Sequence, residues 1–433
     1  MQIQRYVLAV LLAAAVAPCQ SKDGPRQEWL GSQLDDLIEL YREFHRHPEL
    51  SFREKETSKR LAAALRKTGA TVTTLVGGYG LVAVIENGEG PMVMVRGDMD
   101  ALPVPEKTGL PYRSKIYTEN KDGQAAGIMH ACGHDIHMTN LVGTARYLAQ
   151  HKALWKGRVV LIGQPAEERS GGATAMLKAG LYTRFGKPDY ALALHVTNEL
   201  VTGKIGYGIG AVMANVDSVD VTMFGRGGHG AAPHTTIDPV VQGAQLVLQL
   251  QTLVSREISP IDPGVITVGS IHGGSKHNII SDRCHLQITV RSYSNKVRAH
   301  LKEGIIRKAK AVAVGARAPE PKVKFSEGTP ALVNDAALAK RAVAAMRRAM
   351  GQDAVVSIPK VMTAEDFSRF NQGGVPIFMF RVGSIAPARM AGYAKDGKIS
   401  PSLHSPFYYP DARDTLRAGI TAMTAAVLDL LPR

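Results

Sequence analysis

The stretch PMVMVRGDMD, residues 91–100, decides the fold that this 433-residue sequence predicts. Its continuous apolar run, followed by acidic residues, is typical of a parallel β-strand buried on both faces. The stretches LVAVIE (81–86), GRVVLIGQPAEE (157–168) and YALALHV (190–196) read as further strands, and helical patterns lie between them. This alternation predicts an α/β fold with a doubly wound, mostly parallel sheet.

The pattern of apolar residues changes near residue 212. ANVDSVDVTMFGRG, GVITVGSIHGG and RCHLQITVRSYS alternate apolar and polar residues, as half-exposed antiparallel strands do, with helices expected over about 238–256 and 295–314. The first style resumes after about residue 325 with PIFMFRVGS and a C-terminal helix. We therefore expect an α+β domain over 212–324, inserted into a first domain made of 28–211 and 325–433.

The composition is that of a soluble globular protein, with 45% hydrophobic and 21% charged residues. The 52 Lys and Arg residues outnumber the 38 Asp and Glu residues and give a net charge of +14. These basic residues are scattered over the polar sides of helical patterns and form no run interleaved with aromatics. We therefore expect a solvated basic surface and no nucleic-acid partner.

The first 19 residues predict a signal peptide, and hence a periplasmic or secreted protein. One arginine precedes an apolar run from Tyr6 to Ala17, which is too short to span a membrane. No later segment approaches about 18 uninterrupted apolar residues, so we expect no membrane span. Lipidation at Cys19 is the alternative, although Pro18 before it fits a lipoprotein signal poorly.

Metal-ligand side chains gather in MHACGHDIH, residues 129–137, and recur where later strands end. Because the carboxyl ends of parallel strands meet at one edge of a sheet, these side chains should converge. Thiolate, imidazole and carboxylate together suit zinc and similar divalent metals. The sequence therefore predicts a polynuclear metal site with five ligands: Cys132, His134, Glu168, His195 and His404.

Glu167, beside Glu168, is left over from this ligand set. Metal-dependent hydrolysis of amides requires a carboxylate beside the activated water to act as general base, which is the role we predict for Glu167. The alternative is a pair of carboxylates at a helix N-terminus. The surrounding ligands favour the catalytic interpretation.

Two other interpretations of this region stay open. Cys132 and Cys284 remain after signal cleavage and would form a disulfide in an oxidising compartment, although a buried cysteine explains Cys284 more simply. GRGGHG (225–230) has the glycine spacing of a dinucleotide-binding loop. No acidic residue follows at the ribose-binding position, which favours a tight glycine loop that presents His229.

The sequence resembles the M20 family of metallopeptidases from about residue 28 to the C-terminus. Within that family it is most similar to the amidohydrolase subgroup, which includes hippurate hydrolase, N-acyl-amino-acid hydrolases and plant auxin-conjugate hydrolases. The matching stretches, in order, are HRHPELSFREKET, RGDMDALP, MHACGHDIH, QPAEE, GRGGHGAAPH, HNIISD, AEDFS and LHSP.

The resemblance implies two divalent metal ions per chain. Cys132 matches the bridging thiolate, His134 and His195 match the ligands of one ion, and Glu168 and His404 match those of the other. Zn²⁺ or Mn²⁺ is expected, and Co²⁺ or Ni²⁺ also suits these ligands.

The resemblance also implies roles around the metals. Glu167 matches the general base and Asp100 the carboxylate that supports the site. The wider family has a metal-binding histidine where this chain has Asp98; in the subgroup His134 takes over that ligand, which leaves the role of Asp98 open. His137 matches no metal position and is expected to support the ligands.

The inserted domain, 212–324, matches the family's lid, which forms dimers. His229 matches a histidine that polarises the scissile carbonyl, often in the active site of the partner subunit, and Asn278 matches a second polar contact there. Arg291, at the end of a predicted lid strand, is a candidate to bind the substrate carboxylate in bidentate fashion, with a surface arginine as the alternative.

The predicted function is a secreted, metal-dependent amidohydrolase that cleaves the amide bond of N-acyl amino acids. A dipeptidase or aminopeptidase on the same scaffold is one alternative, but no extra acidic cluster in the lid provides a site for a free α-amine. A non-catalytic secreted metal-binding or solute-binding protein is another, and the presence of Glu167 beside Glu168 weighs against it.

Overall fold

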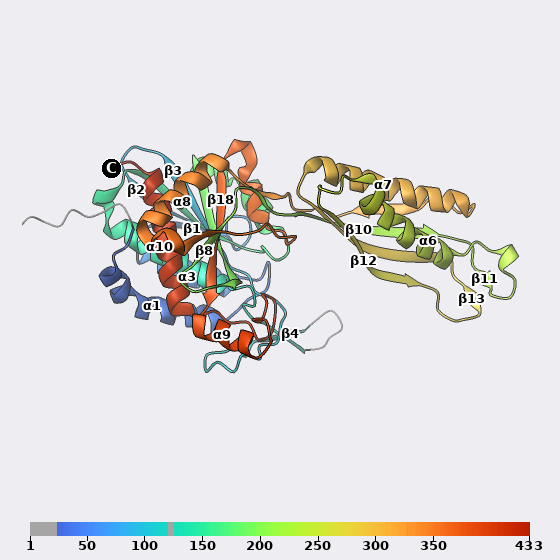
Figure 1. Ribbon diagram of the computed structural model, residues 1–433, viewed down its shortest axis with the longest axis horizontal. Helices are drawn as coiled ribbons and strands as arrows, with labels where there is room; N and C mark the ends of the chain where they lie inside the picture. Colours follow the sequence, from blue (N-terminus) through green and yellow to red (C-terminus); the bar gives the residue numbers. More distant parts are fainter. Residues whose placement is uncertain (1–23, 120–124, 327) are drawn as a thin grey trace, which may run out of the picture.

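The protein has two lobes joined by a few extended segments (Figure 1), as seen in a computed structural model that describes residues 24–119, 125–326 and 328–433. The predicted signal peptide, 1–19, and the lipidation alternative at Cys19 lie outside the described residues. Within the described ranges, no helix is long and apolar enough to cross a membrane.

The larger lobe is built around an eight-stranded mixed sheet. Its four central strands, β6, β3, β7 and β18, run parallel. At one edge β1 and β2 are antiparallel to their neighbours, and at the other edge β8 is antiparallel to β18 but parallel to β17. The predicted mostly parallel sheet is thus confirmed. Across the sheet the strands are β1 (Thr71–Thr74), β2 (Leu81–Asn87), β6 (Gly157–Gln164), β3 (Met92–Asp98), β7 (Tyr190–Val201), β18 (Ile377–Ile385), β8 (Ile205–Tyr207) and β17 (Val355–Ser357).

Successive residues of the central strands pack on opposite faces of the sheet, and helices cover both faces. Val93 and Val95 of β3 belong to the core under α1, α2, α3, α8 and α10, whereas Met94 belongs to the core under α4, α5 and η5. Burial on both sides explains the continuous apolar run at 92–95. The helices are α1 (Gln27–Arg46), α2 (Lys55–Arg66), α3 (His134–Gln150), α4 (Gly172–Lys178), α5 (Leu181–Phe185), the 3-10 segment η5 (Asp366–Gly374), α8 (Ala336–Met350), α9 (Pro387–Lys395) and α10 (Ala412–Leu430).

The smaller lobe is an antiparallel sheet with helices on one face. Its strand order is β12 (Gly264–Gly273), β14 (Arg283–Ser292), β10 (Asn215–Phe224) and β15 (Lys322–Phe325), and α6 (Pro239–Thr252) and α7 (Asn295–Gly315) pack on it (Figure 1). Alternate residues such as Val219 and Val221 point into a separate core beneath the two helices. The chain then returns to the larger lobe, where β18 pairs with β7 and α10 packs on α3.

Cys284 lies in this separate core, fully buried, and both Cys132 and Cys284 are free thiols. The disulfide alternative is therefore wrong, and the buried-cysteine interpretation of Cys284 is confirmed. The glycine loop at 225–230 does not open an α-helix either, since a 3-10 turn at 233–235 follows it and α6 begins only at Pro239, which removes the dinucleotide interpretation. The remaining short elements are β4 (Tyr117–Glu119), β5 (Ala125–Gly127), η1 (Lys152–Leu154), β9 (Gly210–Met213), β11 (Gly228–His229), η2 (Pro233–Thr235), the π-helical η3 (Leu253–Glu257), β13 (Ile279–Ile280), β16 (Leu332–Asn334) and η4 (Gln352–Ala354).

Candidate metal centre

The predicted ligands come together at the carboxyl edge of the central strands. Cys132 lies just before α3 and His134 is its first residue. Gly133 between them has a φ of +76°, a left-handed conformation that favours glycine. His195 does not end its strand as predicted, because β7 continues to Val201. The neighbouring β3 pairs with β7 only as far as Ala193, however, so His195 stands just beyond that pairing and faces the crevice.

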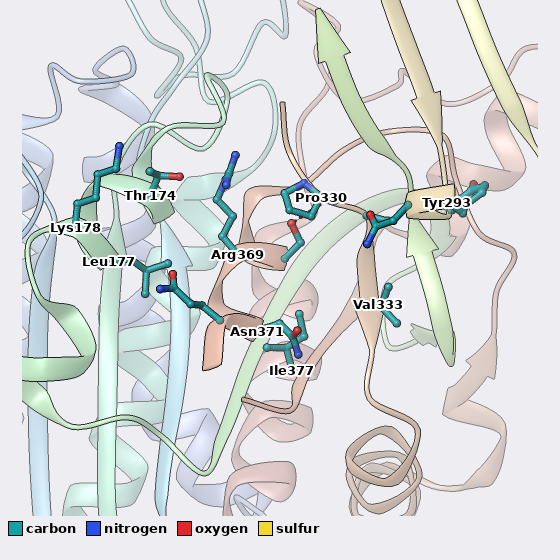
Figure 2. A pocket seen from close by; sticks show the side chains of 13 residues that line it. Thr174, Leu177, Lys178, Tyr293, Pro330, Val333, Arg369, Asn371 and Ile377 are labelled. Atoms are coloured by element: carbon teal, nitrogen blue, oxygen red, sulfur yellow. Dashed lines mark hydrogen bonds between the residues drawn. The ribbon is translucent and has the colours of Figure 1, made fainter. Parts of the chain in front are cut away.

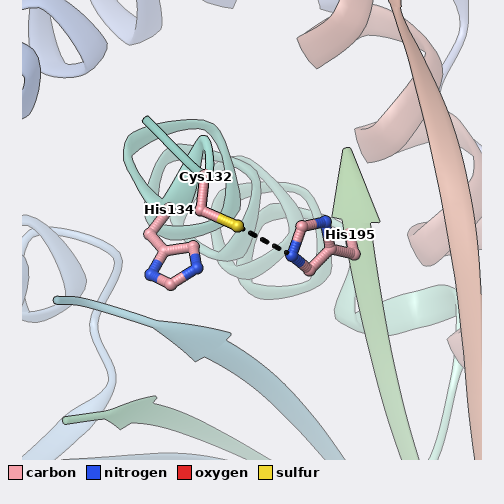
Figure 3. Close-up of side chains that lie close together, drawn as sticks. All are labelled: Cys132, His134 and His195. Carbon is pink, nitrogen blue, oxygen red and sulfur yellow. Dashed lines mark hydrogen bonds between the residues drawn. The ribbon is translucent and has the colours of Figure 1, made fainter. Parts of the chain in front are cut away.

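Cys132, His134 and His195 form the first group of possible metal ligands (Figure 3). One donor atom from each lies within 4.8 Å of the others, and the Cys132 Sγ lies 3.5 Å from the His195 Nε2. The His134 Nδ1 donates to the carbonyl of Asp100 at 2.7 Å, which directs its Nε2 at the group. Among the described residues nothing hydrogen-bonds this buried Nε2, as expected for a nitrogen meant for a metal.

Cys132, Glu168 and His404 form the second group. The His404 Nε2 lies 3.3 Å from the Cys132 Sγ and 3.4 Å from a Glu168 oxygen. His404 has an unusual φ of +68°, and its backbone N–H donates to the carbonyl of Ala131 at 2.9 Å, so that strained backbone is fixed beside the cysteine. Cys132 therefore belongs to both groups, which is the arrangement that a bridging thiolate requires.

The electrostatics of these ligands fit divalent cations. Burial, together with Glu168 and Glu167, holds the pKa of Cys132 well above its ordinary value, and a bound cation would reverse that preference toward the thiolate. Burial keeps the pKa of His195 well below its usual range, so its imidazole is neutral and able to coordinate. The ligand set and its geometry thus suit two metal ions that share one sulfur.

Asp100 fixes the turn that carries the two glutamates. One of its carboxylate oxygens accepts the backbone N–H of Glu167 and the other that of Glu168, both at 3.1 Å, and the Ser51 hydroxyl donates to it at 2.6 Å. Ala166, just before the pair, has a φ of +48°, a conformation that needs such support. Asp100 thus positions both glutamates through their backbone.

Asp98 is held between the neutral imidazole of His137 and the positively charged guanidinium of Arg96. One oxygen accepts from the His137 Nδ1 and the other from the Arg96 guanidinium, both at 2.6 Å. The His137 Nε2 accepts the backbone N–H of Val196 at 3.0 Å, so both of its ring nitrogens are engaged. This agrees with the supporting role expected for His137, because its hydrogen bond to Val196 fixes the backbone of β7 next to His195.

Glu167 lies at the floor of the site with further carboxylates behind it. Burial, Glu365, Glu168 and Asp366 raise the pKa of Glu167 well above its ordinary value, and Arg96 opposes them. Bound cations would bring that pKa back toward the range of a general base. One donor oxygen of Glu167 also lies within 4.8 Å of His134 and Glu168, which places it beside the ligands.

Three residues of this network were not predicted from the sequence. Arg96 is fully buried, and its guanidinium contacts Asp98 at 2.6 Å, Glu365 at 2.7 Å and Asp366 at 3.5 Å. The signal for Arg96 was an arginine within a strand that is otherwise apolar. Glu365 and Asp366 lie in the matching stretch AEDFS, to which no role had been assigned.

The ligands open into a cavity of about 500 Å³ between the lobes. Arg291 lines it and donates to the carbonyl of Met362 at 2.8 Å, so this predicted substrate-binding residue does reach the site. A larger cavity of about 700 Å³ lies where the lobes join, lined by residues such as Lys178, Tyr293 and Arg369 (Figure 2). None of the predicted metal ligands lines that larger cavity, so we assign the chemistry to the smaller one.

His229 and Asn278 do not join the metal ligands within one chain. Both are exposed at β11 and β13, at the end of the smaller lobe that is farthest from the larger one (Figure 1). They lie next to each other there, because the Gly230 N–H donates to the Asn278 carbonyl at 2.9 Å. A role in catalysis would require them to reach the site of another subunit.

An α/β body with two groups of possible metal ligands that share one thiol, and with a carboxylate beside them, is the arrangement expected of a metal-dependent hydrolase. The chain belongs to peptidase family M20/M25/M40, whose family profile matches residues 94–428. The relatives of this family are hydrolases of amide bonds and support the amidohydrolase subgroup.

Two relatives and one solved structure illustrate the similarity. The chain is 37% identical to thermostable carboxypeptidase 1 of Saccharolobus solfataricus, covering 84% of this chain and 92% of that protein. It is 37% identical to N-acetyl-L-cysteine deacetylase of Bacillus subtilis, covering 70% of each. The crystal structure of the Bacillus subtilis YXEP protein, described as a dinuclear metal-binding peptidase of the M20 family, matches 93% of this chain and 99% of its own at 28% identity, with a TM-score of 0.76.

Proposed function

We propose that the protein is a periplasmic or secreted amidohydrolase that releases amino acids from N-acyl amino acids. The observation that carries the proposal is the cavity in which Arg291 faces the glutamates and the shared thiol. A guanidinium there is suited to the carboxylate of an N-acyl amino acid, and the metal ligands lie where its amide bond would reach. The deacetylase relative supports the acylated substrate class.

The chain's own residues account for the proton transfers. Two bound divalent ions would supply Lewis acidity toward the water and the amide carbonyl. Glu167 takes a proton from the attacking water and delivers it to the nitrogen of the leaving amine. Asp100 holds the Glu167 backbone, so the carboxylate meets the substrate without reorganisation. Arg291 orients the substrate through its carboxylate.

A carboxypeptidase acting on peptides is the second candidate. The relative from Saccharolobus solfataricus carries that name and is as similar in sequence as the deacetylase. Both activities use the same carboxylate contact and differ in what lies on the acyl side of the scissile bond. The test therefore compares N-acetyl and N-benzoyl amino acids with free dipeptides and N-blocked dipeptides.

The test uses purified metal-loaded protein, with metal content measured by mass spectrometry. We expect about two metals per chain, release of amino acid from acylated substrates and loss of activity on chelation. Glu167→Gln should keep its metals and lose turnover by roughly 10²- to 10⁴-fold, whereas the exposed-loop control Glu89→Gln should behave as wild type. Near-normal turnover by Glu167→Gln would refute the assignment, and a preference for peptides would favour the carboxypeptidase.

We also propose that residues 212–324 form a dimer in which His229 serves the partner's site. Mixing Glu167→Gln and His229→Ala chains tests this, because a mixed dimer would hold one intact site out of two. With about half of the dimers mixed, about a quarter of wild-type activity should return. No recovery on mixing would place His229 in its own subunit or outside catalysis. The proposed export is tested by the mass of the mature N-terminus, which should lack residues 1–19.

A further inference from the structure

Arg381 is a charged residue in the otherwise buried strand β18. It pairs with His195 across the parallel strands β18 and β7, so the two side chains project to the same face of the sheet. Arg381 lines the cavity that holds Cys132, His195 and His404. The larger lobe thus adds a second guanidinium to the site, besides the one that Arg291 contributes from the smaller lobe.

The charge of Arg381 lacks a close anionic partner. Its Nη2 donates to the thioether sulfur of Met213 at 2.9 Å, which is a weak acceptor. Across the described ranges, no carboxylate oxygen comes within 4.0 Å of Arg381; Glu365 and Glu199 attract it from farther away. Arg381 is half-buried, and partial removal of a guanidinium from water without an anionic partner has a cost, so a chain that retains one next to its reaction site gains something from it.

Arg381 stands at the neck between the metal cavity and a side pocket. The side pocket, of about 240 Å³, shares four lining residues with the metal cavity: Met213, Thr363, Arg381 and Leu403. A substrate group that extends from the metals toward the side pocket must therefore pass the guanidinium. The side pocket is lined by the polar side chains of Thr197 and Asn198, by the carboxylate of Glu199 and by aliphatic walls, so among these groups the positive charge at the neck comes from Arg381.

We propose that Arg381 binds a second carboxylate of the substrate at this neck and so selects dicarboxylic substrates. The inference rests on the proposed amidohydrolase function. The first carboxylate, that of the amino acid backbone, is the one assigned to Arg291, and a single guanidinium pairs best with a single carboxylate in bidentate fashion. The second carboxylate is carried either by an acidic amino-acid side chain or by a dicarboxylic acyl group.

Two pairs of substrates separate these sources, and the members of each pair differ in one charge at nearly constant shape. The first pair is N-acetyl-L-glutamate and N-acetyl-L-glutamine; the second is N-succinyl-L-alanine and its terminal amide, N-succinamoyl-L-alanine. With metal-loaded wild-type protein we expect kcat/KM to favour the acidic member of one pair by at least tenfold. That pair identifies which end of the substrate reaches Arg381.

Arg381→Met should reduce this preference to about one, and Arg381→Lys should restore part of it. The surface substitution Arg341→Met is the control, and it should keep the wild-type ratio. Calorimetry on metal-loaded Glu167→Gln protein, with and without Arg381→Met, should show the same loss as weaker binding of the acidic member. Equal use of both members by wild type, or a preference that survives Arg381→Met, would overturn the proposal while leaving the amidohydrolase intact. Failure to hydrolyse all four substrates would instead count against the function itself.

Discussion

Asp100→Asn tests whether the turn that carries the two glutamates is held by one carboxylate. The substitution keeps the size of the side chain but removes its charge and replaces one acceptor oxygen with an amide that can only donate. Asp100 accepts from the backbone N–H groups of Glu167 and Glu168, and from Ser51. Whichever way the new amide turns, at least one of these donors loses its acceptor.

The expected size of the effect follows from these contacts. A hydrogen bond to a charged acceptor contributes about 1.5–3 kcal/mol, and a buried N–H left without an acceptor costs about 1–3 kcal/mol. We therefore expect the free energy of unfolding of Asp100→Asn to fall by roughly 2–4 kcal/mol. The Asp100 carboxylate also lies 3.4 Å from the Nδ1 of the candidate ligand His134, so the loss of its charge should lower metal affinity by about 10- to 100-fold and kcat/KM by on the order of 10²-fold.

Urea unfolding, metal content and turnover are measured on the same preparations. Ser51→Ala is the matched control, because it removes one hydrogen bond to Asp100 and leaves both backbone bonds intact; its stability should fall by only about 1 kcal/mol. The reasoning is refuted if Asp100→Asn keeps wild-type turnover and metal content, or if Ser51→Ala loses as much of both.

Three further substitutions probe the same network. Arg96→Met leaves three carboxylates buried without their cation and should lower the free energy of unfolding by about 3–5 kcal/mol, against less than about 1 kcal/mol for the surface change Arg341→Met, both measured in urea. Burial lowers the pKa of His45, but Asp135 and a second carboxylate raise it to about 9 from an ordinary 6.5, so its stabilisation is complete below pH 6.5 and is lost as the pH rises through 9. His45→Gln should therefore remove up to about 3 kcal/mol of stability at low pH and flatten the pH dependence between 6.5 and 9. Gly133→Ala would place a Cβ 2.5 Å from a valine methyl of β7 at a φ of +76°, and metal content should fall together with turnover.

The sequence predicted the mostly parallel sheet and led us to expect that the five candidate ligands lie close together, because both follow from local patterns of residues. A continuous apolar run indicates a strand that is buried on both faces of a sheet. Metal-binding side chains at the ends of several such strands indicate that they meet at the carboxyl edge of that sheet. The buried network behind the ligands is not local: Arg96 meets Glu365 across 269 positions of sequence. Such a pairing depends on which loops meet after folding, and only the isolated charge in an apolar strand hinted at it.

The position of His229 relative to the metal ligands could not be predicted from the sequence either. The resemblance gave the residue a catalytic role, yet one chain places it at the exposed tip of the smaller lobe (Figure 1). Nothing in the local sequence states whether a side chain serves its own subunit or another one. Intersubunit geometry has to be measured, which is why the mixing experiment uses two inactive chains.

The two arginines of the buried strands lead to opposite expectations for stability. Arg96 has three carboxylate partners, and its removal leaves these buried carboxylates without a positive charge beside them. Arg381 donates to a sulfur, so Arg381→Met removes a half-buried charge that gains little from its neighbours. We therefore expect the free energy of unfolding of Arg381→Met, measured in urea, to equal that of wild type or to exceed it by up to about 1–2 kcal/mol. The preference of this variant for acidic substrates should be lost. Such a gain in stability with a loss of selectivity is the signature of a residue retained for its ligand. A loss of stability comparable to that of Arg96→Met would instead make Arg381 part of the fold.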